Sequence, residues 1–130
     1  MKIHHVALTV SNIEKSIEWY QRNLNAEILG RYEKRGSEIV HLRIGDGQIE
    51  LFEYGDETQL LPNYRKELES DLRTVGTKHV CFEVSNLINI KQQLENNGVE
   101  IATEIDTTRF GGNYFFIKDP DGILIELYQA

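Results

Sequence analysis

Two histidines and two glutamates recur in the same order along this chain, and their side chains are of the types that bind metals. His5 and His79 each open a segment of alternating apolar residues, and Glu50 and Glu126 each lie within an Ile-Glu-Leu triplet. Neutral imidazole and carboxylate together suit Zn, Ni, Co, Fe or Mn rather than Ca or Cu(I). Four protein ligands around an octahedral ion leave two positions for water or substrate, which is the open geometry that Lewis-acid catalysis needs.

The sequence around these residues is itself repeated. Residues 5–13 (HVALTVSNI) resemble residues 79–87 (HVCFEVSNL), and an Asp-Gly pair precedes both Ile-Glu-Leu triplets. Two matches in the same order, both offset by roughly 75 residues, indicate an internal duplication. We therefore predict a single domain over 1–130 that contains two modules and a polar connector, with approximate bounds 1–54, 76–130 and 55–75 respectively.

Hydrophobic periodicity predicts the same β-α-β-β-β order, an α+β fold, in both modules. Alternation over 2–10 indicates a strand, and residues 11–14 resemble a capping box at the start of a helix. Apolar residues spaced by three or four positions continue that helix: Ile13, Ile17, Tyr20 and Leu24. The remaining predicted elements are strands at 26–33, 38–44 and 48–54, a short connector helix near 63–72, a strand at 78–84, a helix at 87–97 that stops at Gly98, and strands near 100–106, 113–118 and 123–129.

Strand alternation also predicts where the four ligand-type side chains point. Alternate residues within 6–10 form an apolar face suited to packing under a helix, so His5 is expected to point the other way. The Ile and Leu of each triplet match that helix-facing set, which leaves Glu50 and Glu126 on the side of the histidines. A single strand His or Glu is more often structural. The repetition of the pair, and the cost of burying an unpaired carboxylate, favour a metal site.

Composition limits the classes of function. The chain has a formal net charge of −7 and one cysteine, Cys81. An acidic protein lacks the basic face that nucleic acids and anionic membranes require, and no apolar run approaches the roughly 18 residues that span a bilayer. One cysteine excludes an internal disulfide and a cysteine-based zinc site. With no signal-peptide pattern, we expect a cytoplasmic protein whose partner is a small-molecule substrate.

The whole chain resembles the vicinal oxygen chelate superfamily, whose members are built from paired β-α-β-β-β modules. The most specific segments are 5–13, 49–51, 78–80 and the Asp-Pro-Asp-Gly run at 119–122 that leads to Glu126. The resemblance implies a curved mixed sheet around one divalent ion, with Ni, Co or Zn ahead of Mn or Fe. It implies four ligands and a homodimer, and relatives build the site within one chain or between two. The implied ligands are His5, Glu50, His79 and Glu126.

Within this superfamily the segment that precedes Glu126 is similar to that of glyoxalase I. This similarity implies a metal-dependent lyase or isomerase that chelates a small 2-oxo substrate of the hemithioacetal type and transfers a proton through an enediolate. Glu126 is then the catalytic base, and Glu50 either acts on the opposite face or remains a ligand. Because a carbon acid is too weak for a free carboxylate, charge stabilisation at the metal supplies most of the rate gain, and proton transfer adds roughly 10²–10⁴-fold.

Two departures from bacterial glyoxalase I concern the thiol. Thr9 stands where that enzyme carries an arginine that grips glutathione, and Tyr54 stands where it carries an asparagine. Methylmalonyl-CoA epimerase is the alternative enzyme, because it uses similar ligands and the same enolate chemistry. A non-catalytic ligand-binding or drug-resistance protein is a further alternative that retention of all four ligands disfavours. An extradiol dioxygenase ranks lower, since Glu50 would occupy a position that oxygen or substrate needs.

Other side chains are candidates for the wall of the pocket, and the predicted substrate-binding set is Thr9, Phe52, Tyr54, Arg109, Phe116 and Tyr128. Arg109 lies in a Gly-rich loop and could pair with an anionic group, with a solvated hairpin loop as the alternative. Cys81 is expected to line the pocket rather than to act as a nucleophile. His4 is expected to point to the face opposite His5, and His41 is expected at the surface or in packing.

Overall fold

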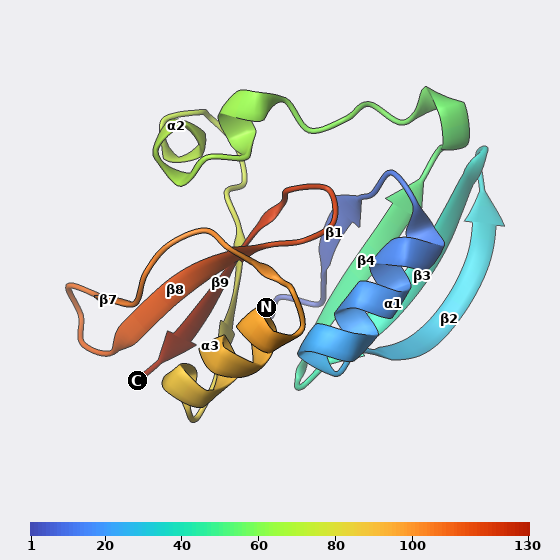
Figure 1. The fold of residues 1–130 in the computed structure, drawn as a ribbon. Helices are drawn as coiled ribbons and strands as arrows, with labels where there is room; N and C mark the ends of the chain where they lie inside the picture. Colours follow the sequence, from blue (N-terminus) through green and yellow to red (C-terminus); the bar gives the residue numbers. More distant parts are fainter. The chain divides into compact units, whose positions relative to one another are not determined.

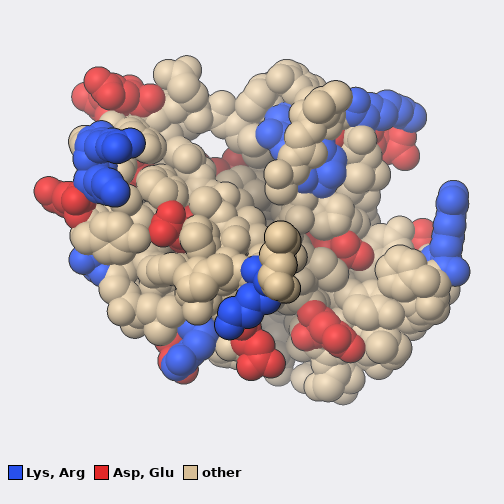
Figure 2. Space-filling view, turned by 180° about the vertical axis from the view of Figure 1, so that it is seen from behind, with Lys and Arg blue, Asp and Glu red and all other residues tan.

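The computed structural model describes residues 1–130, and the chain forms two compact units, Met1–Leu60 and Leu61–Ala130 (Figure 1). Each unit contains one mixed β-sheet and one helix of at least ten residues. None of the helices combines the length and the apolar character needed to cross a membrane. Acidic and basic side chains are interspersed over the surface seen in Figure 2.

Unit 1 has the predicted β-α-β-β-β order: β1 (Val6–Thr9), α1 (Ile13–Leu24), β2 (Glu27–Lys34), β3 (Ser37–Ile44) and β4 (Gly47–Glu53). Its strands lie in the order β1-β4-β3-β2, with β1 parallel to β4 and the other neighbours antiparallel. The helix packs against β3 and β4. Its predicted stripe is buried at Ile13, Ile17 and Tyr20, together with Ile49 and Leu51 of β4.

Unit 2 repeats this plan with one irregularity. Its elements are β5 (Val80–Glu83), α3 (Leu87–Asn96), β6 (Glu100–Ile101), β7 (Asp106–Thr107), β8 (Asn113–Lys118) and β9 (Leu124–Gln129), in the sheet order β5-β9-β8-β6 with β7 also on β8. The predicted strand near 100–106 is therefore two short strands. The backbone N–H groups of Ala102 and Thr103 both donate to the carbonyl of Phe116, so the ladder is interrupted as at a β-bulge.

Both long helices have an asparagine as N-cap. For the first helix this is one residue later than Ser11, the first residue of the predicted capping box. Asn12 and Asn86 are the N-caps, and each side chain accepts a backbone N–H three residues further on at 3.0 Å. The last strand of each unit supplies a further acceptor. Glu53 accepts the first helical N–H of α1 at 3.2 Å, and Gln129 accepts that of α3 at 2.7 Å. The final strand thus fixes where the helix starts.

The segment that joins the repeats is anchored by a buried carboxylate. It contains η1 (Gly55–Glu57) in unit 1, and η2 (Asn63–Arg65) and α2 (Leu68–Leu72) in unit 2, which matches the short helix expected near 63–72. Asp71 is only 1% exposed and accepts a hydrogen bond from Arg65 Nε at 2.8 Å. Lys78, which precedes β5, donates to the carbonyl of Asp71 at 2.6 Å. These contacts tie α2 to the residue next to His79.

Replacing Asp71 should destabilise unit 2 strongly. Asp71→Ala leaves Arg65 without its buried partner, so we expect the free energy of unfolding to fall by about 3–5 kcal/mol, and by less for Asp71→Asn. Urea unfolding followed by circular dichroism measures the change. Glu69→Ala is the matched control, because its pair with Arg73 is exposed and should contribute within about 0.5 kcal/mol. Equal losses for Asp71→Ala and the control would contradict an anchoring role.

Alanine substitutions at two adjacent glycines before β8 can distinguish backbone strain from side-chain crowding. Gly111 and Gly112 have φ angles of 95° and 82°, so alanine strains the backbone at both by about 1–2 kcal/mol. A Cβ on Gly112 would also lie 2.7 Å from the ring of Tyr128, whereas one on Gly111 meets nothing within 4 Å. Gly112→Ala should therefore cost about 1–3 kcal/mol more than Gly111→Ala in urea unfolding. Matching losses would show that the crowding is relieved without cost.

Candidate metal and substrate site

In unit 1 the carboxylate of Glu50 lies on the sheet face away from the buried core. Glu50 is paired in register with Ala7 on β1 and with His41 on β3, so all three side chains point to one side. The ring of His5 lies 5.4 Å from that of His41, which places His5 on the same side. Unit 1 thus presents the predicted pair, His5 and Glu50, on one face, together with the imidazole of His41.

Glu50 is held by a residue that the sequence did not indicate. Its carboxylate accepts a hydrogen bond from the hydroxyl of Tyr32, on β2, at 3.1 Å. Desolvation and then this contact with Glu50 raise the pKa of the Tyr32 hydroxyl, which therefore stays protonated at neutral pH and remains a donor. Tyr32 orients the carboxylate without neutralising its charge.

In unit 2 the equivalent pair is in direct contact. His79 Nε2 lies 2.9 Å from Glu126 Oε2, and the two side chains are 21% and 16% exposed. The other ring nitrogen of His79, Nδ1, is buried and has no hydrogen-bond partner. Phe116, paired in register with Glu126, packs edge-on against the imidazole with 4.8 Å between ring centroids. An imidazole and a carboxylate are therefore fixed together in a largely desolvated position.

These side chains fit a divalent metal by their donor chemistry. Each unit presents an imidazole and a carboxylate together, and the mixed N/O set is one that first-row divalent ions accept. One ring nitrogen of His79 has no hydrogen-bond partner. The carboxylate of Glu50 accepts a hydrogen bond from a neutral tyrosine. Both groups can therefore donate a lone pair to a metal ion. No other His–carboxylate contact within 4.0 Å occurs in the chain.

Cys81 lies beside this pair, since it is in register with Glu126. Desolvation raises the pKa of its thiol to about 11, with a further contribution from the negative charge of Glu126. The thiol is therefore protonated at neutral pH, which agrees with the prediction that Cys81 is not a nucleophile.

The predicted substrate-binding residues of unit 1 form a continuous strip. Thr9 is exposed and is paired in register with Phe52, which lies on the face of Glu50 because it is two residues further along β4. The rings of Phe52 and Tyr54 are stacked with an interplanar angle of 8° and 6.5 Å between centroids. This strip offers flat apolar surface beside the carboxylate.

The predicted substrate-binding residues of unit 2 divide into two kinds. Phe116 is 4% exposed and supports His79 from below rather than presenting an open surface. Arg109 is exposed in the loop between β7 and β8. Tyr128, which is half-buried, donates a hydrogen bond to the carbonyl of Gly111 in that loop at 3.1 Å. Tyr128 thereby ties the loop that carries Arg109 to β9.

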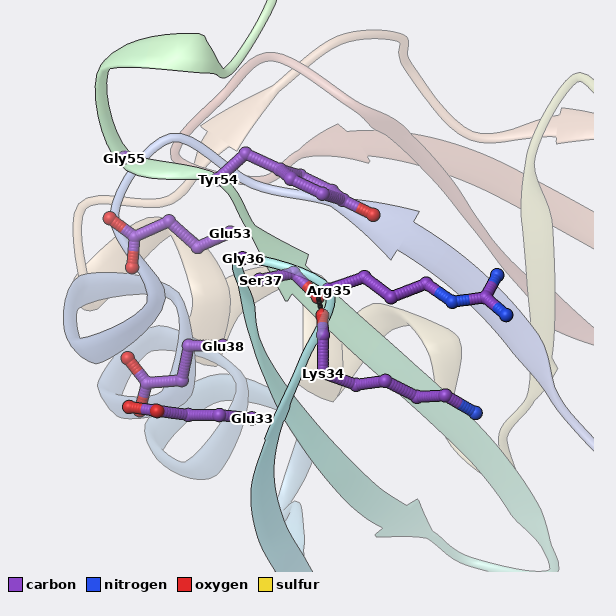
Figure 3. Close-up of a pocket in the computed structure, with 9 residues that line it drawn as sticks. All are labelled: Glu33, Lys34, Arg35, Gly36, Ser37, Glu38, Glu53, Tyr54 and Gly55. Carbon is purple, nitrogen blue, oxygen red and sulfur yellow. Dashed lines mark hydrogen bonds between the residues drawn. The ribbon is translucent and has the colours of Figure 1, made fainter.

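A cavity of about 560 Å³ at the β2–β3 turn extends the unit 1 strip (Figure 3). In Figure 3 the side chains of Lys34, Arg35 and Tyr54 extend to one side of the sheet, and the glutamates that line the cavity extend to the other. Lys34 is two residues from Tyr32 on β2, so it lies on the face of Glu50. Lys34 and Arg35 were not predicted as site residues. Lysine and arginine are common in surface turns, so their sequence positions alone do not indicate a site.

The structure contradicts the prediction for one histidine and adds detail for another. The prediction that His4 points to the face opposite His5 is wrong, because the Nδ1 atoms of the two rings lie 2.8 Å apart. Strand alternation does not apply there, since both residues precede β1. His41, which was expected at the surface or in packing, is partly exposed and faces the same side as Glu50. The register that shows this depends on the β3–β4 turn, which periodicity alone does not specify.

Comparison with known proteins identifies the family. Residues 2–127 match the model of the Glyoxalase/Bleomycin resistance protein/Dioxygenase superfamily, and the chain belongs to this superfamily. A glyoxalase family protein from Enterococcus faecalis has a similar structure, with a TM-score of 0.81 and 26% identity over 98% of this chain and 96% of that one. The resemblance and the fold class inferred from the sequence are thereby confirmed.

Relatives of this chain carry names of more than one activity. YwkD of Bacillus subtilis (strain 168), an uncharacterized protein, is 30% identical over 98% of this chain and 95% of its own length. A lactoylglutathione lyase of Neisseria meningitidis is 27% identical over 99% of this chain and 91% of its own. The mitochondrial methylmalonyl-CoA epimerase of Homo sapiens is 25% identical over 99% of this chain and 74% of its own.

Proposed function

We propose that this protein is a metal-dependent lyase or isomerase of the glyoxalase I type, acting on the hemithioacetal of a small 2-oxo aldehyde. The observation that carries the proposal is the His79–Glu126 contact of 2.9 Å in a largely desolvated position, repeated in unit 1 by the shared face of His5 and Glu50. These four side chains would hold one divalent ion, with Ni, Co or Zn ahead of Mn or Fe. When bound, the ion supplies Lewis-acid stabilisation of negative charge on neighbouring substrate oxygens.

Glu126 is the base in this proposal. Its carboxylate removes the proton from the carbon that bears sulfur, and the electron pair moves into the adjacent carbonyl. The same carboxylate then returns the proton to the neighbouring carbon, and the hydroxyl proton of the sulfur-bearing carbon passes to the oxygen of the former carbonyl. The sulfur-bearing carbon thereby becomes the thioester carbonyl, and the product has the composition of the substrate. The low exposure of Glu126 keeps water from competing for the proton. Proton transfer by a positioned carboxylate raises the rate by about 10²–10⁴-fold. His79 holds the carboxylate in place through the 2.9 Å contact.

Glu50 serves as a ligand or as a second proton acceptor on the opposite face of the substrate. The hydrogen bond from Tyr32 leaves one carboxylate oxygen free of that donor and fixes the orientation of the group. A positioned carboxylate needs less reorganisation when substrate arrives, which is how the tyrosine would favour the reaction.

The unit 1 strip supports a substrate with an anionic thiol part. Thr9 and Tyr54 replace the glutathione-binding side chains expected from glyoxalase I, while Lys34 and Arg35 supply positive charge beside Tyr54. The stacked rings of Phe52 and Tyr54 would contact the uncharged portion. Arg109 is a further cation for an anionic group. We also propose that the protein is a cytoplasmic homodimer that binds this small-molecule substrate.

A methylmalonyl-CoA epimerase is the alternative, and the relatives so named at similar identity favour it. The same carboxylates would remove and return a proton beside a thioester, and the cations of the β2–β3 turn also suit the phosphates of CoA. A non-catalytic drug-resistance protein remains less favoured, because such a protein has no use for two carboxylate–imidazole sets.

Glu126→Gln should abolish turnover. We expect kcat to fall by at least about 10²–10⁴-fold, because the amide cannot accept the proton. The assay follows thioester formation from methylglyoxal with several thiols, beside proton exchange into methylmalonyl-CoA. Glu95→Gln, an exposed carboxylate of α3 paired with Lys91, is the control and should retain activity. Retained turnover in Glu126→Gln would refute the assigned base, and activity with the CoA ester alone would establish the alternative enzyme.

Removal of metal tests both enzyme proposals together. Dialysis against a chelator should eliminate turnover, and addition of Ni²⁺, Co²⁺ or Zn²⁺ should restore it, because charge on the substrate oxygens is then stabilised again. Metal content is measured by elemental analysis of the same samples. Full activity in metal-depleted protein would overturn the lyase and the epimerase alike.

The cations at the β2–β3 turn should affect binding rather than chemistry. Lys34→Ala and Arg35→Ala each remove a contact made equally in ground and transition states, so KM should rise about tenfold with kcat nearly constant. Lys15→Ala, an exposed cation on α1, is the matched control and should change neither constant. Unchanged KM in both turn variants, or a loss confined to kcat, would contradict a substrate-binding role.

A further inference from the structure

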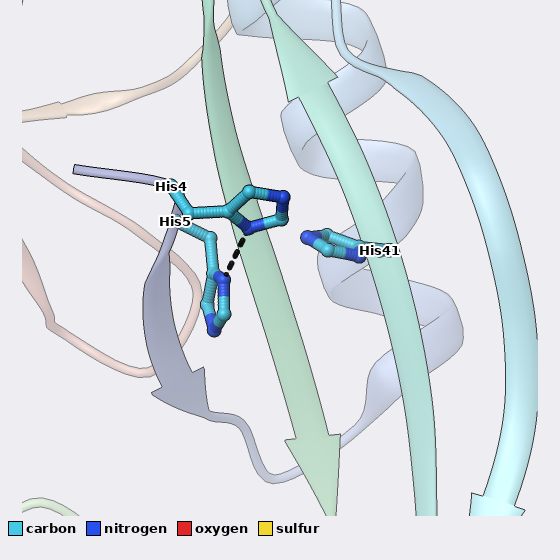
Figure 4. A group of neighbouring side chains, drawn as sticks. All are labelled: His4, His5 and His41. Carbon is cyan, nitrogen blue, oxygen red and sulfur yellow. Dashed lines mark hydrogen bonds between the residues drawn. The ribbon is translucent and has the colours of Figure 1, made fainter. Parts of the chain in front are cut away.

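Three histidines of unit 1 lie close together on the face of its sheet that carries Glu50. His4 and His5 lie just before β1, and His41 lies on β3. One imidazole nitrogen from each residue can be chosen so that all three lie within 4.8 Å of one another. Figure 4 shows the three rings close together, with the ring of His41 directed toward that of His4. The proposed catalytic ligand set uses only His5, so the positions of His4 and His41 call for a separate explanation.

The hydrogen bonding within this cluster is incomplete. The Nδ1 atoms of His4 and His5 lie 2.8 Å apart, so one imidazole donates to the other and a single proton lies between two lone pairs. The Nε2 atom of His41 is buried and has no hydrogen-bond partner. A buried polar atom without a partner is unfavourable, and in native proteins it is commonly satisfied by water or an ion. A cation that accepts lone pairs from the rings would satisfy it.

We propose that His4, His5 and His41 form a second metal site, selective for a divalent ion that prefers imidazole, such as Ni²⁺, Cu²⁺ or Zn²⁺. Its donor set is three nitrogens without a carboxylate, unlike the mixed set of the catalytic proposal. Nitrogens on a tetrahedral Zn²⁺ are spaced by about 3.3 Å, given Zn–N bonds of about 2.0–2.1 Å. The observed spacings bracket that value, and His4 and His5 are exposed outside the strand, so they can adjust.

The two proposed metal sites share His5, so both cannot be fully occupied at the same time. An ion held by the three histidines uses the imidazole that the catalytic ligand set needs, so the two complete sites exclude each other. The second site requires residues of unit 1 alone. The histidine cluster therefore competes with the catalytic ligand set for metal.

Titration of the full-length protein with NiCl₂ by isothermal calorimetry tests this site. The variant His79→Gln/Glu126→Gln lacks the unit 2 donors and should still bind one Ni²⁺. Adding His41→Gln, or His4→Gln, to that variant should weaken binding by at least a hundredfold. Arg43→Gln is the matched control, since Arg43 is an exposed residue of β3 two positions from His41, and it should leave the affinity unchanged. Circular dichroism establishes that each variant is folded.

Two results would overturn the proposal: absence of Ni²⁺ binding in folded His79→Gln/Glu126→Gln, or unchanged affinity when His41→Gln is added to it. The catalytic proposal fails differently. His4→Gln/His41→Gln keeps all four of the proposed catalytic ligands and should still bind Ni²⁺. Loss of binding in that variant, with binding retained in His79→Gln/Glu126→Gln, would remove the four-ligand centre and leave the histidine site standing.

Discussion

The parallel pairing of the first and last strand in each unit is the constraint on which the site and the core both depend. It sets Ala7 opposite Glu50 and Cys81 opposite Glu126. Because side chains alternate along a strand, this register places Glu50 on the face of Ala7 and Glu126 on the face of Cys81, away from the helix of each unit. A slip of one residue would turn the glutamate toward the helix and its flanking Ile and Leu toward solvent. The buried Ile49 and Leu51 therefore enforce the position of Glu50.

The same register extends to the helix termini. Glu53 and Gln129, three residues beyond the two glutamates, accept the first backbone N–H of α1 and α3. A helix start that is tied to the last strand cannot shift along its axis without losing this acceptor. The packing of the helix and the orientation of the ligand-type side chains are consequently set by one strand. This coupling explains how a module of modest size can hold a carboxylate in a defined direction.

The sequence predicted what periodicity and repetition can specify. The β-α-β-β-β order and the direction of Glu50, away from the buried Ile49 and Leu51, follow from alternation, since both depend on which residues must be buried. The split of the strand near 100–106 was not predictable, because it depends on two N–H groups that share one carbonyl of Phe116. Tyr32 and His41 were missed for a related reason. Their neighbours are set by the register of the hairpins, and turn geometry rather than hydrophobic pattern decides that register.

The two repeats carry equivalent pairs in different surroundings. In unit 2 the imidazole contacts the carboxylate directly and rests against Phe116, away from water. In unit 1 the carboxylate is bound by a tyrosine, the histidine is exposed among two others, and cations and stacked rings lie along the same strip. A desolvated carboxylate suits proton transfer, whereas an exposed face with cations and aromatic rings suits recognition of a polar ligand. The asymmetry between two related halves is the physical reason that the proposal gives the role of base to Glu126 and substrate recognition to the surroundings of Glu50.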